Sequence, residues 1–474
     1  MTNQESHNLP SLRNPNLSYR EALELVMSLA DFERSTHSPT NSSFHLERMR
    51  LLMAQLGNPH YGIPTLHVAG TKGKGSTAAM ITSILRAAGL KIGLYTSPHL
   101  HSAVERIRIG LDPISKNDFA NLVRETWPAA QHVSQMAEFG SVTTFEFITS
   151  MAFLHFMTNR VDYQVIEVGL GGRLDATNIV NPSISVITSI SLDHTHTLGD
   201  SVTRIATEKA GIIKPEVPVI VAPQSEEAMS VLRKISKDMK APLIEVEKQI
   251  NWNKTKADLR EQSFNLNCND RLSGKSYMLT MPLLGDYQLE NAATAIASIR
   301  VLDSQSSVIS DNNITQGLKE VTWPGRFQIL KTNKCKFVVD GAHNPYSLGK
   351  FVQTISEYFR FNRLITIFGT LGGHSTEEML SELKMLNPVM ILTRSRHPRS
   401  NSIENIFSIS VKQGLSVEAA FDNVGEATQT AISLANEDDL IIGTGSLSVV
   451  AEIIEEVEGI SPELYPSFKG TAFR

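Results

Sequence analysis

The 474-residue sequence has few cysteines, no long apolar run and no excess of basic residues. Its two cysteines, Cys268 and Cys335, form no C-x-x-C pair and lack metal-ligand spacing, so we expect free thiols in a reducing compartment. No apolar run reaches the length of about 18 residues that a membrane span needs, and the polar first twenty residues contain no secretory signal. We therefore expect a cytoplasmic protein.

The charge balance argues against one class of partner. Lysine and arginine number 44 against 49 aspartates and glutamates, a net charge of −5, so bulk nucleic-acid binding is not expected. Any anionic ligand must then be held by local cations. An apolar content of 41% and a charged content of 20% are typical of a globular chain, and the length allows two or three domains.

A glycine-rich loop at residues 70–77, GTKGKGST, is the clearest motif that the chain contains. The apolar run before it predicts a strand, and the helical spacing of apolar residues after it predicts a helix. Glycines let backbone amides turn toward an anion, the helix N-terminus adds unpaired N–H groups, and Lys74 supplies a charge. The loop departs from G-x-x-x-x-G-K-[ST], because Val68 replaces a glycine and Gly75 follows the lysine. It predicts a phosphate site, the alternative being a tight structural turn.

Polar side chains follow three further predicted strands, at the point where each strand ends. These side chains are Ser97, Glu167 and His194. Open α/β sheets bind ligands at the carboxyl ends of their strands, so a shared site is predicted there. Mg²⁺ prefers oxygen ligands, which favours Ser97 and Glu167 and makes His194 an unusual member. The structural alternatives are a turn before Pro98, a helix N-cap interaction and a packed histidine, respectively.

The alternation of strand and helix patterns predicts an α/β protein with two units. Strands are expected at residues 65–69, 91–95, 161–168, 184–190, 217–221, 337–339, 364–368, 389–392 and 440–442, helices at 19–32, 44–56, 78–88, 145–157, 225–239 and 291–301, and hairpins within 250–282. The pattern restarts near Trp323. We therefore expect a flexible tail at 1–17, a first domain at 18–322 and a second at 323–474. The pair Glu105 and Arg106 is expected on a solvated strand face.

Six motifs stand in a fixed order along the chain. They are residues 70–76 (GTKGKGS), 96–100 (TSPHL), 167–178 (EVGLGGRLDATN), 192–195 (LDHT), 208–211 (EKAG) and 340–345 (DGAHNP). This order resembles the dihydrofolate synthase/folylpolyglutamate synthase family, a branch of the Mur ligases, from about residue 45 to the C-terminus. The resemblance implies a P-loop ATPase domain of the Mur-ligase type, with a central and mostly parallel sheet, and a smaller Rossmann-like α/β domain at the C-terminus.

The resemblance also implies a reaction. ATP would phosphorylate a pterin-linked carboxylate, and the amine of L-glutamate would attack the resulting acyl phosphate to form an amide bond. ATP and Mg²⁺ are the implied cofactors, and the implied substrates are L-glutamate with dihydropteroate or a reduced folate. Which of these folate forms is used, or whether both are, stays open, because family members with either activity share the six motifs.

The resemblance assigns roles to individual residues. The implied ATP-binding residues are Gly70, Thr71, Gly73, Lys74, Gly75, Ser76, Thr77, Asn291, Arg326 and Asp340. Ser97 and Glu167 would bind one Mg²⁺ and His194 a second. Lys209, which composition alone places on a solvated helix face, matches a lysine that is carbamylated to become an anionic metal ligand. Catalysis would depend on Lys74, Lys209 and His343, with domain closure completing the site.

The chain departs from the family pattern at three places, one of which is residues 372–375 (GGHS), where an Asp-Lys-Asp run is often seen. Lys72 stands where asparagine is common and adds a cation that can simply be exposed, and Tyr287 stands where histidine is usual. Two other functions fit part of the pattern: a Mur-type cell-wall amino-acid ligase, against which residues 169–178 argue, and a non-catalytic nucleotide-binding regulator, which would need no lysine suited to carbamylation. We expect a monomer without nucleic-acid or membrane partners.

Overall fold

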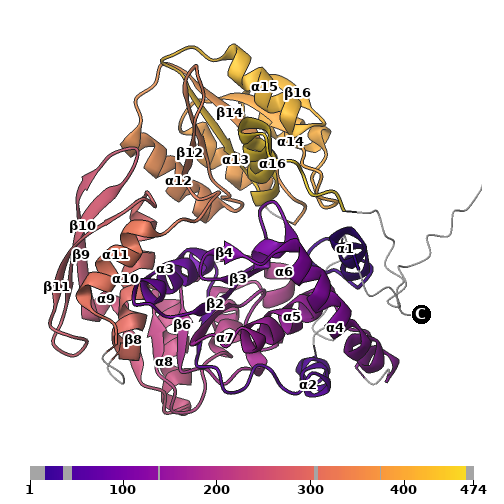
Figure 1. The fold of residues 1–474 in the computed structure, drawn as a ribbon. Helices are drawn as coiled ribbons and strands as arrows, with labels where there is room; N and C mark the ends of the chain where they lie inside the picture. The colour runs from indigo at the N-terminus through magenta and orange to yellow at the C-terminus, as the bar shows by residue number, and fades with distance from the viewer. Residues whose placement is uncertain (1–16, 36–44, 137–138, 304–307, 374, 466–474) are drawn as a thin grey trace, which may run out of the picture.

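The computed structural model describes residues 17–35, 45–136, 139–303, 308–373 and 375–465. These residues form two α/β units, one above the other in Figure 1. The tail predicted for residues 1–17 lies outside the described residues except for Leu17, which is buried. No helix within the described ranges is long and apolar enough to cross a membrane.

The first unit is built on an eight-stranded sheet with the order β4-β3-β2-β5-β1-β6-β7-β8. Its strands are β1 (Thr65–Ala69), β2 (Ile92–Tyr95), β3 (Ile107–Ile109), β4 (Asp112–Pro113), β5 (Tyr163–Glu167), β6 (Ile184–Ile187), β7 (Val219–Val221) and β8 (Leu243–Glu245). All neighbours are parallel except β2–β3 and β3–β4. The apolar strand β1 is buried along its whole length, as expected for a parallel strand covered on both faces.

Helices cover both faces of this sheet. One face packs against α3 (Lys74–Ala87), α10 (Asp286–Asp303) and α11 (Asp311–Glu320), and another core contains α1 (Tyr19–Met27), α2 (Leu46–Gln55), α4 (Lys116–Gln135) and α5 (Thr144–Thr158). The short helices η2 (Ala103–Arg106), η3 (Ala176–Ile179), α6 (Thr195–Leu198) and α9 (Val246–Gln249), with α7 (Val202–Ala210) and α8 (Glu226–Asp238), complete the unit. The predicted hairpins are confirmed as the antiparallel strands β9 (Ile250–Ala257), β10 (Gln262–Cys268) and β11 (Ser276–Met281).

The second unit has a six-stranded sheet with the order β12-β13-β17-β14-β15-β16. Its strands are β12 (Gln328–Leu330), β13 (Lys336–Val339), β14 (Leu364–Phe368), β15 (Val389–Thr393), β16 (Ser416–Phe421) and β17 (Leu440–Thr444), and only β12 is antiparallel to its neighbour. Two apolar cores flank it, and its helices are α12 (Pro345–Tyr358), α13 (Thr376–Lys384), α14 (Ile403–Lys412), α15 (Val424–Leu434) and α16 (Leu447–Glu458). The predicted fold class is confirmed.

Several predicted elements are shorter in the structure, and for two of them the contacts show why. The helix expected at residues 19–32 ends at Met27, because the Ser28 hydroxyl donates to the Leu25 carbonyl and Asp31 then accepts the amides of the following turn. The strand expected at 184–190 ends at Ile187. Beyond it, the Ser189 carbonyl accepts hydrogen bonds from amides of the glycine-rich loop instead of from a neighbouring strand. Helix α4 was not predicted, and its Pro128 lacks the backbone donor that an interior helical residue normally uses.

Candidate active site

The glycine-rich loop joins β1 to α3, as the sequence predicts. Gly70 has a φ of +149°, and a Cβ there would lie 1.9 Å from the Thr188 hydroxyl oxygen. Gly73 has a φ of +88°, and a Cβ there would lie 2.2 Å from Asn291 Oδ1. Only glycine therefore fits at these two positions. The amides of Thr71 and Lys72 donate to the Ser189 carbonyl at 2.8 and 3.1 Å, which fixes the loop beside the end of β6.

The loop leads directly into the N-terminus of α3, which begins at Lys74. The first amides of a helix have no partner within the helix, so the amides of residues 74–76 can bind an anion. Helix α10 supports this turn: Thr77 Oγ1 donates to Asn291 Oδ1 at 3.5 Å, and Gln288 Nε2 donates to Ser76 Oγ at 3.4 Å. Amides, one lysine and close-packed glycines together suit a phosphate chain.

Glu167 and Ser97 lie side by side at the carboxyl edge of the sheet, next to this loop. Strand pairing sets Glu167 level with Val68 of β1, and the Ser97 amide donates to Glu167 Oε2 at 3.2 Å. Burial raises the pKa of Glu167 to about 7, although the charge of Lys74, whose Nζ is 3.9 Å from Oε1, opposes the shift. A buried carboxylate with so little compensation, beside a serine, suits a hard cation such as Mg²⁺.

A metal at this point would need ligands of several kinds. Within the described chain, no group of three or more His, Cys, Asp or Glu side chains lies close enough together to hold an ion. Oxygens from serine, from a modified lysine or from the bound nucleotide would have to complete the shell. His194 immediately precedes α6 in the left-handed conformation, with a φ of 49°, and its amide donates to Asp193 Oδ1 at 3.0 Å.

Lys209 is buried at the end of α7 and is not the solvated lysine that composition suggests. Only 4% of the residue is exposed, and its Nζ donates to the Gly70 carbonyl at 2.7 Å. Burial, together with the nearby charge of Lys74, lowers its pKa to about 7. A large fraction of this amine is therefore neutral near pH 7, which is the form that can react with carbon dioxide.

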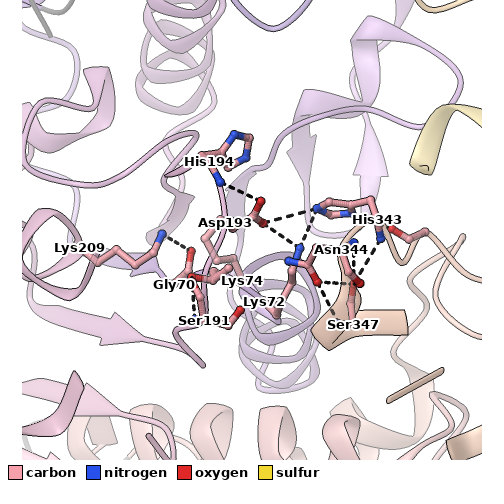
Figure 2. A network of polar contacts seen from close by, with 12 residues as sticks. Gly70, Lys72, Lys74, Ser191, Asp193, His194, Lys209, His343, Asn344 and Ser347 are labelled. Atoms are coloured by element: carbon pink, nitrogen blue, oxygen red, sulfur yellow. Dashed lines mark hydrogen bonds and ion pairs between the residues drawn. The ribbon is translucent and has the colours of Figure 1, made fainter. Parts of the chain in front are cut away.

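Lys72 connects the two units, as Figure 2 shows. Its Nζ donates to Asp193 Oδ2 at 2.9 Å and contacts His343 Nε2 of the second unit at 2.7 Å. His343 Nδ1 lies 2.8 Å from the Gly341 carbonyl, which can only accept, so Nδ1 carries the proton and Nε2 accepts from Lys72. The expectation that Lys72 is simply exposed is wrong, because only 17% of its side chain is accessible to solvent.

The charges of this group support one another. Burial alone would raise the pKa of Asp193, but the charge of Lys72 holds it well below its usual range. Burial lowers the pKa of Lys72 to about 8 despite the opposing charge of Asp193, and burial also lowers the pKa of His343. The arrangement is therefore a lysine–aspartate ion pair with a neutral histidine.

Asp340 and Arg326 lie in the second unit, at the carboxyl end of β13 and in the turn before β12. The Asp340 carboxylate accepts the amides of Phe327 and Ala342 at 2.8 and 2.9 Å and the Tyr287 hydroxyl at 3.4 Å. Burial raises its pKa, although the charge of Arg326 opposes the shift. Tyr287, the departure noted in the sequence, thus links α10 to the second unit.

Two family descriptions match the chain over most of its length. Residues 68–299 match the Mur ligase middle domain, and residues 325–447 match the Mur ligase glutamate ligase domain. A Bacillus subtilis protein named dihydrofolate synthase/folylpolyglutamate synthase is 33% identical over 413 residues, which cover 86% of this chain and 94% of the relative. An Escherichia coli protein of the same name is 31% identical and covers 92% and 97%, respectively. The chain belongs to the dihydrofolate synthase/folylpolyglutamate synthase family.

Solved structures of the family have the same fold. A Mycobacterium tuberculosis folylpolyglutamate synthase complexed with ADP superposes with a TM-score of 0.82 at 29% identity, over 93% of this chain and 98% of that chain. A Thermotoga maritima folylpolyglutamate synthase gives a TM-score of 0.79 at 30% identity, over 94% and 98%. The family resemblance that the six motifs predicted is therefore confirmed.

This family member has a cavity of about 860 Å³ between its two units. The lining includes Ser97, His194, Arg326 and His343, so the cavity reaches the predicted site. It extends to a second group of residues, most of them polar or charged, that are not among the predicted site residues: Arg34, His99, Arg106, Arg396, Arg399 and Tyr465. The cluster of basic residues at 394–399 follows β15 and was the one available signal, since a charged loop at a parallel strand end commonly faces a ligand.

The expectation for Glu105 and Arg106 is wrong. Arg106 is 5% exposed and its guanidinium makes two hydrogen bonds with the Glu33 carboxylate, while Glu105 accepts the amides of residues 100–102. The pair ends the short helix η2, and both charges are held by neighbouring segments rather than on a strand face. Local sequence could not show this, because the partner Glu33 lies about seventy residues earlier.

Proposed function

We propose that this protein uses ATP to join L-glutamate to the carboxylate of dihydropteroate or a reduced folate. One observation carries the proposal: the carboxyl edge of the first sheet and His343 of the second unit line one cavity, and Lys72 of the phosphate loop contacts His343 there. A ligase needs this convergence, because the nucleotide, the acceptor carboxylate and the amine must be in contact at once.

The loop and its neighbours are proposed to bind ATP. The amides that open α3 and the Lys74 ammonium would hold the phosphates, and Asn291 keeps the Gly73 turn in place by close packing. Arg326 and Asp340 would contact the nucleotide from the second unit. Transfer of the terminal phosphoryl group to the acceptor gives an acyl phosphate, whose phosphate is a far better leaving group than a carboxylate oxygen.

Glu167 and Ser97 are the proposed ligands of one Mg²⁺, with His194 near a second. When bound, Mg²⁺ neutralises charge on the transferring phosphoryl group. The neutral amine of Lys209 is proposed to form a carbamate: Nζ bonds to the carbon of carbon dioxide and loses a proton, and the neutral amine becomes an anionic oxygen donor. Its burial next to Gly70 aims this group at the phosphate loop.

The second unit is proposed to complete the site. His343, held neutral and with its Nδ1 proton fixed on Gly341, presents Nε2 to Lys72 and so positions that cation between the units. The position of the boundary at residue 323 remains a proposal. It is supported by the end of α11 at Glu320 and the start of β12 at Gln328.

The test is ADP release by the purified protein with ATP, Mg²⁺ and L-glutamate, with dihydropteroate in one reaction and tetrahydrofolate in the other. Turnover with one acceptor alone identifies a dihydrofolate synthase or a polyglutamate synthase, and turnover with both identifies a bifunctional enzyme. Absence of turnover with both acceptors would contradict the proposal and return the cell-wall ligase and the regulator to consideration. The predicted monomer in the cytoplasm remains a prediction, checked by size-exclusion chromatography and by localisation of the tagged protein.

A further inference from the structure

The segment that follows α16 crosses from the second unit to the first. Helix α16 ends at Glu458, and Gly459, with a left-handed φ of 69°, turns the chain away. In Figure 1 the yellow segment beyond α16 runs toward α1, and a hydrogen bond between Tyr19 and Glu463 shows that the two are in contact. We call residues 460–465 the C-terminal strap. The whole strap lies beyond residue 447, where the match to the glutamate ligase domain ends.

The strap is attached to the first unit through the carboxylate of Glu463. This carboxylate accepts the Tyr19 hydroxyl at 2.5 Å, the Ser102 hydroxyl at 2.7 Å and the Ala103 amide at 2.9 Å. Three donors from two separate elements, α1 and the start of η2, therefore converge on one anion. Hydrogen bonds to a charged acceptor are about twice as strong as neutral ones, so the attachment is specific.

Tyr465 is fixed by a directed chain of hydrogen bonds. Arg106 Nε donates to His99 Nδ1 at 2.9 Å, so the ring proton of His99 lies on Nε2, 2.7 Å from the Tyr465 hydroxyl oxygen. The Tyr465 hydroxyl then donates to Glu463 Oε1 at 2.6 Å. The Arg34 guanidinium lies 4.4 Å from the centre of the ring. The Tyr465 ring is thus held in one orientation by contacts with the first unit and with Glu463 of the strap itself.

The strap also forms part of the cavity wall. Glu463, Leu464 and Tyr465 line the same cavity as Ser97 and His343, which places an oriented aromatic side chain in the space that leads to the reaction centre. A pterin is a flat heteroaromatic ring system, and such rings stack on aromatic and guanidinium faces. L-Glutamate has no ring and gains nothing from this surface.

We propose that Tyr465, anchored by Glu463, is a specificity-determining residue that binds the ring end of the pterin-linked acceptor. This inference rests on the proposed function. It assigns no role to the strap in binding ATP or in the chemical step. Its consequence is selective: loss of the ring or of its anchor weakens acceptor binding and leaves the affinities for ATP and L-glutamate unchanged.

The test compares steady-state kinetics of the full-length Tyr465→Ala variant with those of the wild type, varying the acceptor, ATP and L-glutamate in turn. Loss of one stacking surface predicts a KM for the acceptor that is roughly 5- to 30-fold higher. The KM values for ATP and L-glutamate should stay within about twofold. Tyr61→Ala is the matched control, because Tyr61 is 63% exposed and does not line the cavity.

Glu463→Gln provides a second variant that keeps the size of the side chain. A neutral amide has one acceptor oxygen and accepts hydrogen bonds more weakly than the carboxylate that now faces three donors. The strap should therefore loosen, and the KM for the acceptor should rise, as in Tyr465→Ala. A wild-type acceptor KM in both variants would overturn the proposal while leaving the proposed function standing. Equal increases in all three KM values would also overturn it, since they indicate a general disturbance. Absence of wild-type turnover would remove the proposed function and this inference together.

Discussion

Lys209 has surroundings that are unusual for a lysine. It is buried, it donates to a backbone carbonyl of the phosphate loop, and its pKa lies at about 7. Burial of an ammonium without a carboxylate partner is costly, so a stable protein is expected to convert it to a neutral or an anionic group.

We expect Lys209→Ala to lose roughly 100-fold or more in kcat, the scale seen when one electrostatic group is removed from an active site. Added bicarbonate should not restore the activity. Lys209→Arg should be equally impaired, because arginine keeps the cation but forms no carbamate. Lys234→Ala, which changes an exposed lysine of α8, is the control. A fully active Lys209→Ala variant would contradict the carbamate assignment.

Glu167 predicts a pH-dependent stability. Its pKa of about 7 in the folded protein lies above the usual 4.5, so the folded state keeps a proton that the unfolded chain releases between these values. The free energy of unfolding should therefore fall as the pH rises from about 4.5 to 7.

Without nucleotide or Mg²⁺, Glu167→Gln should be more stable than the wild type by about 2 to 3 kcal/mol at pH 8, and by no more than about 1 kcal/mol at pH 5. Urea unfolding at the two pH values measures this difference. An equal gain at both would show that ionisation of Glu167 is not the cause.

Glu167→Gln should also lower both the turnover rate and the affinity for Mg²⁺. A glutamine oxygen is a poorer ligand for a hard cation than a carboxylate, so the Mg²⁺ concentration at half-maximal rate should rise by roughly 10- to 100-fold. A Mg²⁺ titration of ADP release at saturating ATP measures it. An unchanged titration curve would place Glu167 outside the metal site.

At the scale of elements, the β1–loop–α3 unit depends on glycines for two separable reasons. Gly73 combines a left-handed backbone with a contact to Asn291 that a Cβ would turn into a clash. Gly89, at the other end of α3, has a nearly equal φ of +82° but open space around it. The pair therefore separates the cost of the backbone conformation from the cost of the contact.

Gly89→Ala should lower the free energy of unfolding by about 1 to 2 kcal/mol, the cost of the left-handed conformation alone. Gly73→Ala should lower it by roughly 2 kcal/mol more and weaken ATP binding at least about tenfold, because the loop must shift away from Asn291. Urea unfolding and nucleotide titration of both variants give the comparison. Equal stability losses would mean that the loop is free to relax around the added methyl group.

The elements were predicted where local sequence determines them. The apolar run of β14 gave the observed bounds, Leu364–Phe368, because a fully buried parallel strand needs no pattern beyond continuous hydrophobicity. The apolar runs of β5 and β6 likewise predicted that Glu167 and His194 lie at the same edge of the first sheet. The contacts of Lys72 with His343 and of Tyr465 with His99 could not be predicted, since each joins residues more than 250 positions apart.

At the scale of the whole molecule, polar contacts hold the two units together around the site. Besides Lys72 and His343, the Tyr358 hydroxyl donates to Gln262 Oε1 at 3.1 Å, and His101 lies 3.2 Å from Glu455. Polar interfaces of this kind can open and close with bound ligand, which suits an enzyme that must admit three substrates and then exclude water.

Coupling between the units should be measurable through Lys72 and His343. We expect Lys72→Asn and His343→Ala each to lower kcat/KM for ATP, and the double variant to lose less than the sum, with a coupling energy of roughly 1 to 2 kcal/mol. Pairing His343→Ala with Lys234→Ala supplies a cycle with no contact. Strictly additive effects for Lys72 and His343 would mean that their contact does not link the units during turnover.

The central claim, that the acceptor carboxylate is activated as an acyl phosphate, is tested most directly by isotope transfer. The acceptor carboxylate is labelled with heavy oxygen, and the phosphate released during ligation to L-glutamate is analysed by mass spectrometry. Phosphate leaves with the oxygen that bridged it to the acyl carbon, so the account predicts one labelled oxygen in each phosphate released. Unlabelled phosphate, formed together with the glutamylated product, would contradict it.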